Sequence, residues 1–375
     1  MTEGTVRLGI IGAGWWGQEV HARGVLSHPQ AELVALCSRT EAKLRRAGEA
    51  LGVSALYMEF QDLLDHDGLD AVTIATTHDL HYPIAQAALE RGLHVFCEKP
   101  LGLNSRETAR LAALAKERRV VNMVAFTNRW VPEAAHAKQL LDHGFCGTVF
   151  HVTACKSAGY GGPGSSFMWR TDPARSGGGV LFDLGCHVLD LCQWLVSPIR
   201  AVCADVQTTV PSRRGDDGEA IPTAVDDAVA CLVAFETGPR GVVHVSWTAS
   251  GPGYDRTEIA GSEASLRLGL NADAWVNALT VCPRGSSDPH PVSPSDALQG
   301  RIPRDASTPE QREAAQRAFI EDHPSLVRAF IGAIVGEGAS CPSFADGHRT
   351  QQVMDAILLS SRERRWVEVA EVSHA

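Results

Sequence analysis

The segment from Val6 to Gly17, VRLGIIGAGWWG, constrains the fold of this chain more than any other. A short apolar run over residues 6–11 is followed at once by three glycines in G-x-G-x-x-G spacing: Gly12, Gly14 and Gly17. Such a run is typical of a parallel strand that is covered on both faces. The glycines allow a tight turn, bring the backbone close to a pyrophosphate and let the next helix pack against the strand. A glycine-rich turn of another α/β protein is the alternative, and a second apolar strand at 31–37 favours dinucleotide binding.

Strand-like and helix-like segments alternate over the first third of the chain. The predicted strands are Val6–Ile11, Ala31–Cys37, Ala55–Tyr57, Ala71–Ala75, His94–Cys97 and Val120–Phe126. The predicted helices are Trp15–Ser27, Glu41–Leu51, Gln61–Asp67, Tyr82–Arg91 and Ser105–Arg118. Strands separated by helices of this length indicate a parallel, doubly wound sheet. We therefore expect an α/β fold whose first domain, residues 1–127, is a dinucleotide-binding Rossmann domain.

The pattern changes near Asn128, after which strands follow one another with few helices between them. The predicted strands are Thr148–Cys155, Arg200–Thr208, Asp227–Phe235, Gly241–Thr248, Arg256–Ile259, Ala264–Leu268, Ala278–Cys282 and Trp366–Val369. The predicted helices are Pro132–His143, Gly179–Leu195, Pro309–Ile320, Ser325–Gly336 and Thr350–Arg364. This pattern indicates an α/β domain over residues 128–375 with a large, mostly antiparallel, open-faced sheet. The last helix and tail are expected to pack back on the first domain, and Pro211–Pro222 and Ser286–Thr308 are expected to be exposed loops.

An open-faced sheet needs a cover on each face. One face can take the helix Gly179–Leu195, and the other is a natural interface between copies of the chain. We therefore expect a homodimer or homotetramer formed through the open sheet of the second domain.

Composition excludes several other classes of protein. The formal net charge is −10 and no run of Lys and Arg occurs, so nucleic acid is not expected as a partner. No apolar run approaches the roughly 20 residues that span a bilayer, and the N-terminus lacks a secretory pattern, so a cytoplasmic protein without a membrane partner is expected. The ten cysteines form no C-x-x-C pair, and Cys37, Cys97 and Cys231 lie in apolar runs, so we expect free thiols. The spacing of His78 and His81 does not suffice for a metal site, and no metal is expected.

Lys99 is the first candidate for chemistry. The fifth predicted strand ends in the sequence Glu98-Lys99-Pro100, which places the lysine at the carboxyl edge of the sheet, where ligands bind. A partly desolvated ammonium there can polarise a substrate oxygen or hold a developing alkoxide. A surface lysine before a turn-forming proline is the alternative, and spacing alone does not separate the two.

A second group of candidates lies in the second domain. Three glycines at 177–179 precede a predicted helix that carries Asp183 and His187, four residues apart and hence on one face, which Asp190 continues. A histidine is the usual proton acceptor near neutral pH. The alternative is a core histidine satisfied by an aspartate one turn away.

Taken in order, three segments resemble the Gfo/Idh/MocA family: GAGWWG, then AVTIATTHDLHYPIAQAALERGLHVFCEKPL, then WRTDPARSGGGVLFDLGCHVLDL. The namesakes of this family are glucose–fructose oxidoreductase, inositol 2-dehydrogenase and a rhizopine-catabolism protein. The similarity extends to DGHRTQQVMDAILLSSRERRWVEV near the end of the chain. It implies a Rossmann domain followed by an α/β domain with a large open sheet. It also implies NAD(P)-linked oxidation or reduction of a sugar, a polyol or a close derivative.

The resemblance assigns roles to residues. It implies that Lys99 contacts substrate oxygens, that His187 is the catalytic acid/base, and that Asp183 orients the substrate and pairs with Lys99. It further implies a cis bond between Lys99 and Pro100. Other substrate contacts are expected from two basic residues, Arg129 and Lys156. The expected cofactor-binding residues are Gly12, Gly14, Trp15, Trp16, Gly17, Thr76, Thr77, His78, His81, Glu98, Lys99, Asn128, Trp169 and Arg170.

The residues after the second strand bear on the choice of cofactor. NAD-preferring folds usually carry an acid there, which binds the ribose 2′-hydroxyl. This chain has CSRT at 37–40 and no acid before Glu41. Ser38 and Arg39, with Lys43 in reach, suit a 2′-phosphate. The alternative is that Arg39 stacks on adenine and that both cofactors are accepted. Because of the basic residues, we expect NADP as the preferred cofactor and NAD as the second possibility.

The sequence therefore predicts an NAD(P)-dependent sugar or polyol dehydrogenase or reductase that acts on CH–OH groups. One alternative is a glycoside-processing enzyme that uses transient oxidation with a tightly held cofactor. A second is a non-sugar reductase of the same fold, such as a biliverdin or dihydrodiol enzyme. A third is a non-catalytic NADP-binding regulator. The presence of Lys99, Asp183 and His187 together argues against the last two.

Overall fold

The computed structural model describes residues 4–251, 253–271, 276–294, 324–338 and 341–372. The described residues form two compact units. The first takes its residues from 1–126 and 320–348, and the second from 127–319 and 349–375.

The first unit is built on a six-stranded sheet in the order β3-β2-β1-β4-β5-β6, with every pair parallel. Its strands are β1 (Val6–Ile11), β2 (Ala31–Cys37), β3 (Ala55–Tyr57), β4 (Ala71–Ile74), β5 (His94–Cys97) and β6 (Asn122–Val124). Its helices include α1 (Arg23–Leu26), α2 (Glu41–Leu51), α3 (Phe60–Leu64), α4 (His81–Glu90), α5 (Ser105–Arg118) and α10 (Pro324–Val335). The central strands are buried on both faces, as their apolar composition predicts. The doubly wound parallel sheet is confirmed, and its strands end at one common edge.

The helix after β1 differs from the prediction. A π-helical turn, Gly17–Ala22, comes before the short α1, whereas the sequence predicted one α-helix from Trp15 to Ser27. A single wide turn shifts the apolar pattern by only one residue, so periodicity does not distinguish it from an α-helical turn.

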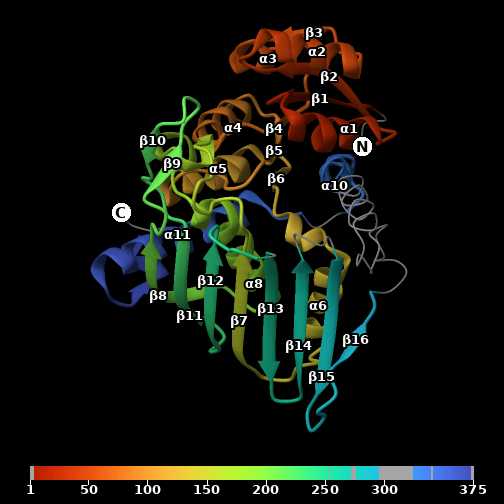
Figure 1. The fold of residues 1–375 in the computed structure, drawn as a ribbon. Coiled ribbons are helices and arrows are strands. Elements are labelled where there is room, and N and C mark those ends of the chain that lie inside the picture. Colours follow the sequence, from red (N-terminus) through yellow and green to blue (C-terminus); the bar gives the residue numbers. More distant parts are fainter. Residues whose placement is uncertain (1–3, 252, 272–275, 295–323, 339–340, 373–375) are drawn as a thin grey trace. The chain divides into compact units, whose positions relative to one another are not determined.

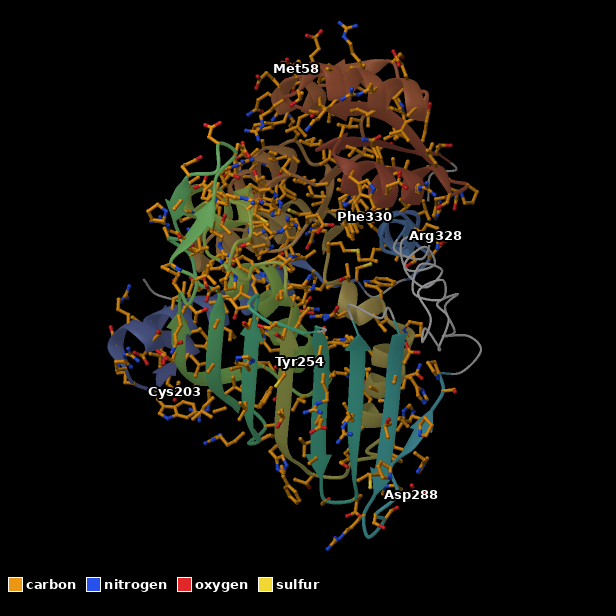
Figure 2. All side chains as sticks on the ribbon, viewed as in Figure 1. Met58, Cys203, Tyr254, Asp288, Arg328 and Phe330 are labelled. Carbon is orange, nitrogen blue, oxygen red and sulfur yellow. The ribbon has the colours of Figure 1, made fainter. Side chains whose placement is uncertain are left out.

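Helix α10, although late in the chain, belongs to the first unit. Its Phe330, labelled in Figure 2, packs on Phe96 of β5, and the ring centroids are 5.8 Å apart. Farther along, the backbone N–H of Val124 donates to the carbonyl of Pro342, and that of Phe344 donates to the side chain of Asn122. Residues 324–338 and 341–348 therefore add to the core of this unit.

Helix α11 (Phe344–Glu363) begins earlier than the predicted Thr350. Its first turn contains Gly347, where a Cβ would crowd Leu101 and Val124. This glycine lets the first turn of the helix pack closely.

The second unit is built on a nine-stranded sheet in the order β16-β15-β14-β13-β7-β12-β11-β8-β17. Its strands are β7 (Val149–Ser157), β8 (Ile199–Gln207), β11 (Ala228–Phe235), β12 (Arg240–Ser246), β13 (Tyr254–Gly261), β14 (Ala264–Asn271), β15 (Val276–Pro283), β16 (His290–Val292) and β17 (Val367–Glu368). Its other helices are α6 (Pro132–Asp142), α7 (Pro173–Ser176), α8 (Cys186–Leu195) and α12 (Val369–Val372). Only β7 and β12 pair in parallel, and α6 and α8 lie behind the sheet in Figure 1. The mostly antiparallel sheet with one open face is thus confirmed.

Two segments that were expected to be exposed loops contain strands. β9 (Ser212–Arg214) and β10 (Ala220–Pro222) pair as a hairpin, and β16 lies within the second segment. The prediction was wrong for Arg213, which is fully buried because its guanidinium donates to the carbonyl of Gly161 and lies 3.7 Å from Asp227. The predicted helix Pro309–Ile320 lies outside the described residues.

All ten cysteines are free thiols. Cys37, Cys97 and Cys231 are buried, as predicted. Burial raises the pKa of Cys37 and of Cys231 to about 12, so both stay protonated and inert at neutral pH. Within the described ranges, no helix has the length and apolarity that a bilayer crossing requires.

Candidate active site

The turn after β1 is shaped by its three glycines. Gly12 has a φ of 108°, and a Cβ on it would overlap the carbonyl oxygen of Ala75. A Cβ on Gly17 would overlap the carbonyl oxygen of Gly12. A Cβ on Gly14, in contrast, would meet nothing within 4 Å, so the backbone there faces open space. The turn is therefore closely packed at Gly12 and Gly17 and open at Gly14, an arrangement that suits a dinucleotide.

The end of β2 carries basic side chains. Arg39 and Lys43 are exposed, and Ser38 is half-buried. Glu41, the first acid after the strand, is held by Arg45 at 2.8 Å on the surface of α2. Ser38, Arg39 and Lys43 therefore follow β2 closely in the chain, and their predicted role at a ribose phosphate stays a prediction.

Glu98 ties the glycine-rich helix to the end of β5. Its Oε1 accepts from the indole N–H of Trp16 at 2.7 Å and lies 3.1 Å from Nε2 of the buried His21. Burial by itself would raise the pKa of Glu98, but His21, Trp16 and the charge of Lys99 together hold it below its ordinary value. Glu98 is therefore a carboxylate at neutral pH. Trp16, a predicted cofactor contact, uses its N–H on Glu98, whereas the neighbouring Trp15 is exposed.

The backbone on either side of Lys99 is fixed. The Lys99–Pro100 bond is cis, as the resemblance implied. Nδ1 of the buried His81 lies 2.7 Å from the carbonyl oxygen of Pro100, and its Nε2 lies 3.3 Å from that of Thr76. Burial lowers the pKa of His81, so the ring is neutral and its single N–H is best placed on Nδ1, where it donates to Pro100. His81 thus holds the turn that carries Lys99, and its predicted contact with the cofactor stays a prediction.

Three more residues that were predicted near the cofactor, Thr76, Thr77 and His78, lie in the segment after β4. Thr76 and Thr77 are half-buried, and the Thr77 hydroxyl donates to Asp79 at 2.5 Å. His78 is buried, with its ring 5.6 Å from that of His81.

In the second unit, the glycines at 177–179 are required by packing. Gly177 ends α7 with a φ of 75°, which is unfavourable for other residues. A Cβ on Gly179 would overlap the backbone of Asp226. The Asp226 carboxylate accepts from the backbone N–H groups of Gly179 and Leu181, each at 2.7 Å. Asp226 thus caps the helical segment that carries the candidate catalytic pair.

Asp183 lies in a π-helical turn, Leu181–Gly185, and His187 lies in the first turn of α8. Both side chains are buried. The Asp183 carboxylate accepts a hydrogen bond from the hydroxyl of Tyr160, and its other oxygen lies 3.4 Å from Nε of Arg170. The guanidinium of Arg170 also stacks on the ring of Trp169, 4.5 Å from its centroid. The carboxylate is therefore held at both oxygens.

The two basic residues predicted to bind substrate have buried acidic partners. Arg129, in the short helical turn 127–130 beside the buried Asn128, binds Asp190 through two nitrogens at 2.8 and 2.5 Å. Nζ of Lys156 lies 2.5 Å from the buried Asp255. Buried pairs of this kind fix their cations strongly in position.

Several residues of the site were not predicted, namely Tyr160, His21 and Asp226. Tyr160 is the lone aromatic residue in a stretch of Gly, Ser and Pro, which is a usable signal. Asp226 accepts hydrogen bonds from residues that are 45 and 47 positions away in the chain, and no local sequence pattern indicates these contacts. Among the residues that the structure describes, no three His, Cys, Asp or Glu side chains form a group suited to a metal ion.

Two family models match the chain. Residues 6–126 match the model described as "Oxidoreductase family, NAD-binding Rossmann fold". Residues 134–267 match the model described as "GFO/IDH/MocA C-terminal domain".

Individual relatives cover nearly the whole chain. Levoglucosan dehydrogenase of Pseudarthrobacter phenanthrenivorans is 28% identical over 98% of this chain and 99% of its own. Inositol 2-dehydrogenase of Rhizobium meliloti is 25% identical over 98% of this chain and 100% of its own. A solved structure of levoglucosan dehydrogenase in complex with NADH and levoglucosan is 28% identical, with a TM-score of 0.84, over 97% of this chain and 99% of that one.

Proposed function

The chain belongs to the GFO/IDH/MocA family of oxidoreductases, and we propose that it transfers a hydride between a nicotinamide cofactor and a CH–OH carbon of a sugar, a polyol or a close derivative. The observation that carries the proposal is the placement of Lys99 at the end of β5. It lies two strands from the open glycine turn of β1, in a backbone fixed by His81 and Glu98. Relatives that act on levoglucosan and on inositol support the substrate class.

Each unit has a part in the proposed reaction. The first unit, proposed as the dinucleotide-binding domain, would hold the pyrophosphate at Gly12–Gly17, with Thr76 and Thr77 close to the cofactor. The second unit is proposed as the substrate and oligomerisation domain. When bound, the nicotinamide supplies the hydride acceptor or donor. In the oxidative direction, His187 accepts the hydroxyl proton, Lys99 stabilises the alkoxide and Asp183 orients the substrate.

A panel of sugars and inositols, assayed with NAD and NADP in parallel, tests the function. We expect NAD(P)H to accumulate with at least one substrate. Turnover of a glycoside without accumulation of NAD(P)H would instead support the glycoside-processing alternative, because that cycle regenerates its cofactor. Tight cofactor binding with no turnover over the whole panel would contradict the proposal and support a regulator.

We propose NADP as the preferred cofactor because of Ser38, Arg39 and Lys43. NADH in the levoglucosan dehydrogenase complex makes NAD the competing outcome. We expect Arg39→Ala to raise the KM for NADP by about 10- to 100-fold, because a charged hydrogen bond to the 2′-phosphate is lost. The KM for NAD should change little.

The matched control is Arg45→Ala, which removes an exposed arginine of α2 that pairs with Glu41. Steady-state kinetics with both cofactors checks the prediction. Equal effects of Arg39→Ala on NAD and NADP would show that Arg39 does not read the phosphate.

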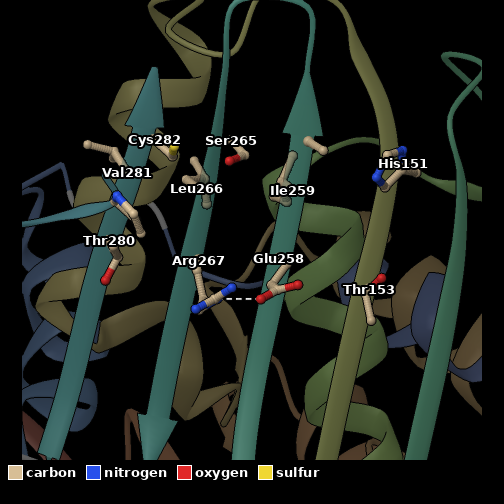
Figure 3. Close-up of a pocket in the computed structure, with 12 residues that line it drawn as sticks. His151, Thr153, Glu258, Ile259, Ser265, Leu266, Arg267, Thr280, Val281 and Cys282 are labelled. Carbon is tan, nitrogen blue, oxygen red and sulfur yellow. Dashed lines mark hydrogen bonds and ion pairs between the residues drawn. The ribbon is translucent and has the colours of Figure 1, made fainter. Parts of the chain in front are cut away.

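We propose that the open face of the second sheet joins two copies of this chain. A row of cross-strand neighbours crosses this face from β8 to β15: Cys203, Leu232, Val242, Thr153, Glu258, Arg267 and Thr280. Figure 3 shows its last four members beside a hollow of about 310 Å³, with Arg267 paired to Glu258. Leu232 and Val242 are cross-strand neighbours that are 47% and 44% exposed. Adjacent exposed apolar side chains of this kind support an interaction surface.

Leu232→Asp is expected to lower the oligomeric state, because a charge would be buried at the centre of the apolar part of the face. Size-exclusion chromatography with light scattering measures this directly. Leu26→Asp is the control, since Leu26 is an exposed leucine of α1. A monomeric wild type, or an unchanged assembly in Leu232→Asp, would contradict the proposed interface.

A further inference from the structure

Tyr160 lies in a loop that is fixed on both sides. The backbone N–H of Ala158 donates to Ser246, and that of Gly161 donates to Trp247, so the loop continues along β12. The carbonyl of Gly161 accepts from the buried Arg213 of the β9–β10 hairpin. These hydrogen bonds therefore fix the position of the backbone at Tyr160.

The two ends of the Tyr160 side chain have different surroundings. The hydroxyl donates to Asp183, and burial and the Asp183 charge raise the pKa of the phenol well above its usual value. The phenol is thus a permanent donor at neutral pH. The residue as a whole nevertheless remains 43% exposed, so the ring offers an accessible surface beside a candidate catalytic carboxylate. Trp247 packs against the ring, with centroids 5.7 Å apart, and supports its orientation.

An anchored, exposed aromatic ring suits one kind of substrate. The face of the ring is electron-rich and attracts weakly positive C–H groups. Pyranoses and cyclitols gather C–H bonds on one rigid face, whereas an open-chain polyol must lose rotational freedom to form such a face. A tyrosine that is already fixed loses little entropy on contact.

We propose that Tyr160 is a substrate-binding residue whose ring stacks on the C–H face of a sugar or cyclitol ring while its hydroxyl holds Asp183, so that the site selects cyclic substrates over open-chain polyols. This inference rests on the proposed sugar or polyol oxidoreductase function, and it narrows the substrate class.

The test compares Tyr160→Leu and Tyr160→Phe with the wild type, each as the cofactor-loaded full chain. The probes are levoglucosan and myo-inositol as cyclic compounds and D-sorbitol as the open-chain one. Calorimetry gives Kd, and NAD(P)H formation gives kcat and KM. Tyr160→Leu should weaken binding of the cyclic probes roughly tenfold, because the stacking surface is lost. Tyr160→Phe should keep their affinity and lower kcat, because only the donor to Asp183 is lost.

Trp366→Leu is the matched control, because Trp366 is 45% exposed and directly precedes β17. It should leave all constants unchanged. The KM for the cofactor should be the same in all variants, which separates substrate stacking from general disturbance of the fold.

The outcomes separate this inference from the proposed function. The inference is supported if the wild type binds the cyclic probes more tightly than sorbitol and Tyr160→Leu loses this difference. This holds even if no probe is oxidised, and then only the oxidoreductase proposal fails. Oxidation of cyclic probes with equal Kd and KM in wild type and Tyr160→Leu overturns the inference and leaves the function standing. Equal affinity of the wild type for sorbitol, or no binding of either cyclic probe, also overturns the inference.

Discussion

Replacing Lys99 with alanine is expected to lower kcat by about two to three orders of magnitude, because the alkoxide that develops on the substrate loses its nearest cation. The KM for the cofactor should change less than kcat, since the pyrophosphate is expected at the glycine turn after β1, two strands away from β5 in the sheet. Steady-state kinetics with the best substrate of the panel measures both constants.

The control for Lys99→Ala is Lys116→Ala, which removes an exposed lysine near the end of α5. Cofactor binding by fluorescence and the Tm of both variants show whether the fold is intact. Near wild-type kcat in a folded, cofactor-binding Lys99→Ala protein would remove Lys99 from the mechanism.

His187→Ala should lower kcat by about 10²- to 10⁴-fold, the usual contribution of a general base. In the oxidative direction only a neutral imidazole accepts the hydroxyl proton, so the wild-type rate should fall as the pH drops through the neutral range. The variant should lose this dependence. The pH profile of kcat/KM for the two proteins checks this.

Two additions sharpen the His187 experiment. Added imidazole should restore part of the activity of His187→Ala, which a purely structural histidine would not permit. His143→Ala, at an exposed position after α6, should behave as wild type. An unchanged pH profile in His187→Ala would assign the base to another group.

Much of the fold could be predicted because its signals are local. Short apolar runs at 6–11, 31–37 and 71–74 are separated by helices, and all became strands of one parallel sheet. The errors arose where distant residues decide. Arg213 is buried with partners 48 and 52 positions away, and Gly347 lies in a helix that packs closely on Leu101.

In the candidate site, too, local signals could be read from the sequence and long-range contacts could not. Lys99, Asp183 and His187 stand in recognisable motifs, and their catalytic roles stay predictions. The motif does not reveal that Tyr160 and Arg170 hold Asp183, or that His81 supports the turn of Lys99. These contacts depend on loops and turns whose paths are set by tertiary packing.

The most direct test of the central claim is a crystal structure of the protein with its nicotinamide cofactor and a substrate from the panel. The account predicts that Nζ of Lys99 and the imidazole of His187 both lie within about 3 Å of one substrate oxygen. The pyrophosphate should lie on the turn Gly12–Gly17. A complex in which the ammonium and the imidazole contact different ends of the substrate, or in which the dinucleotide lies elsewhere, would contradict it.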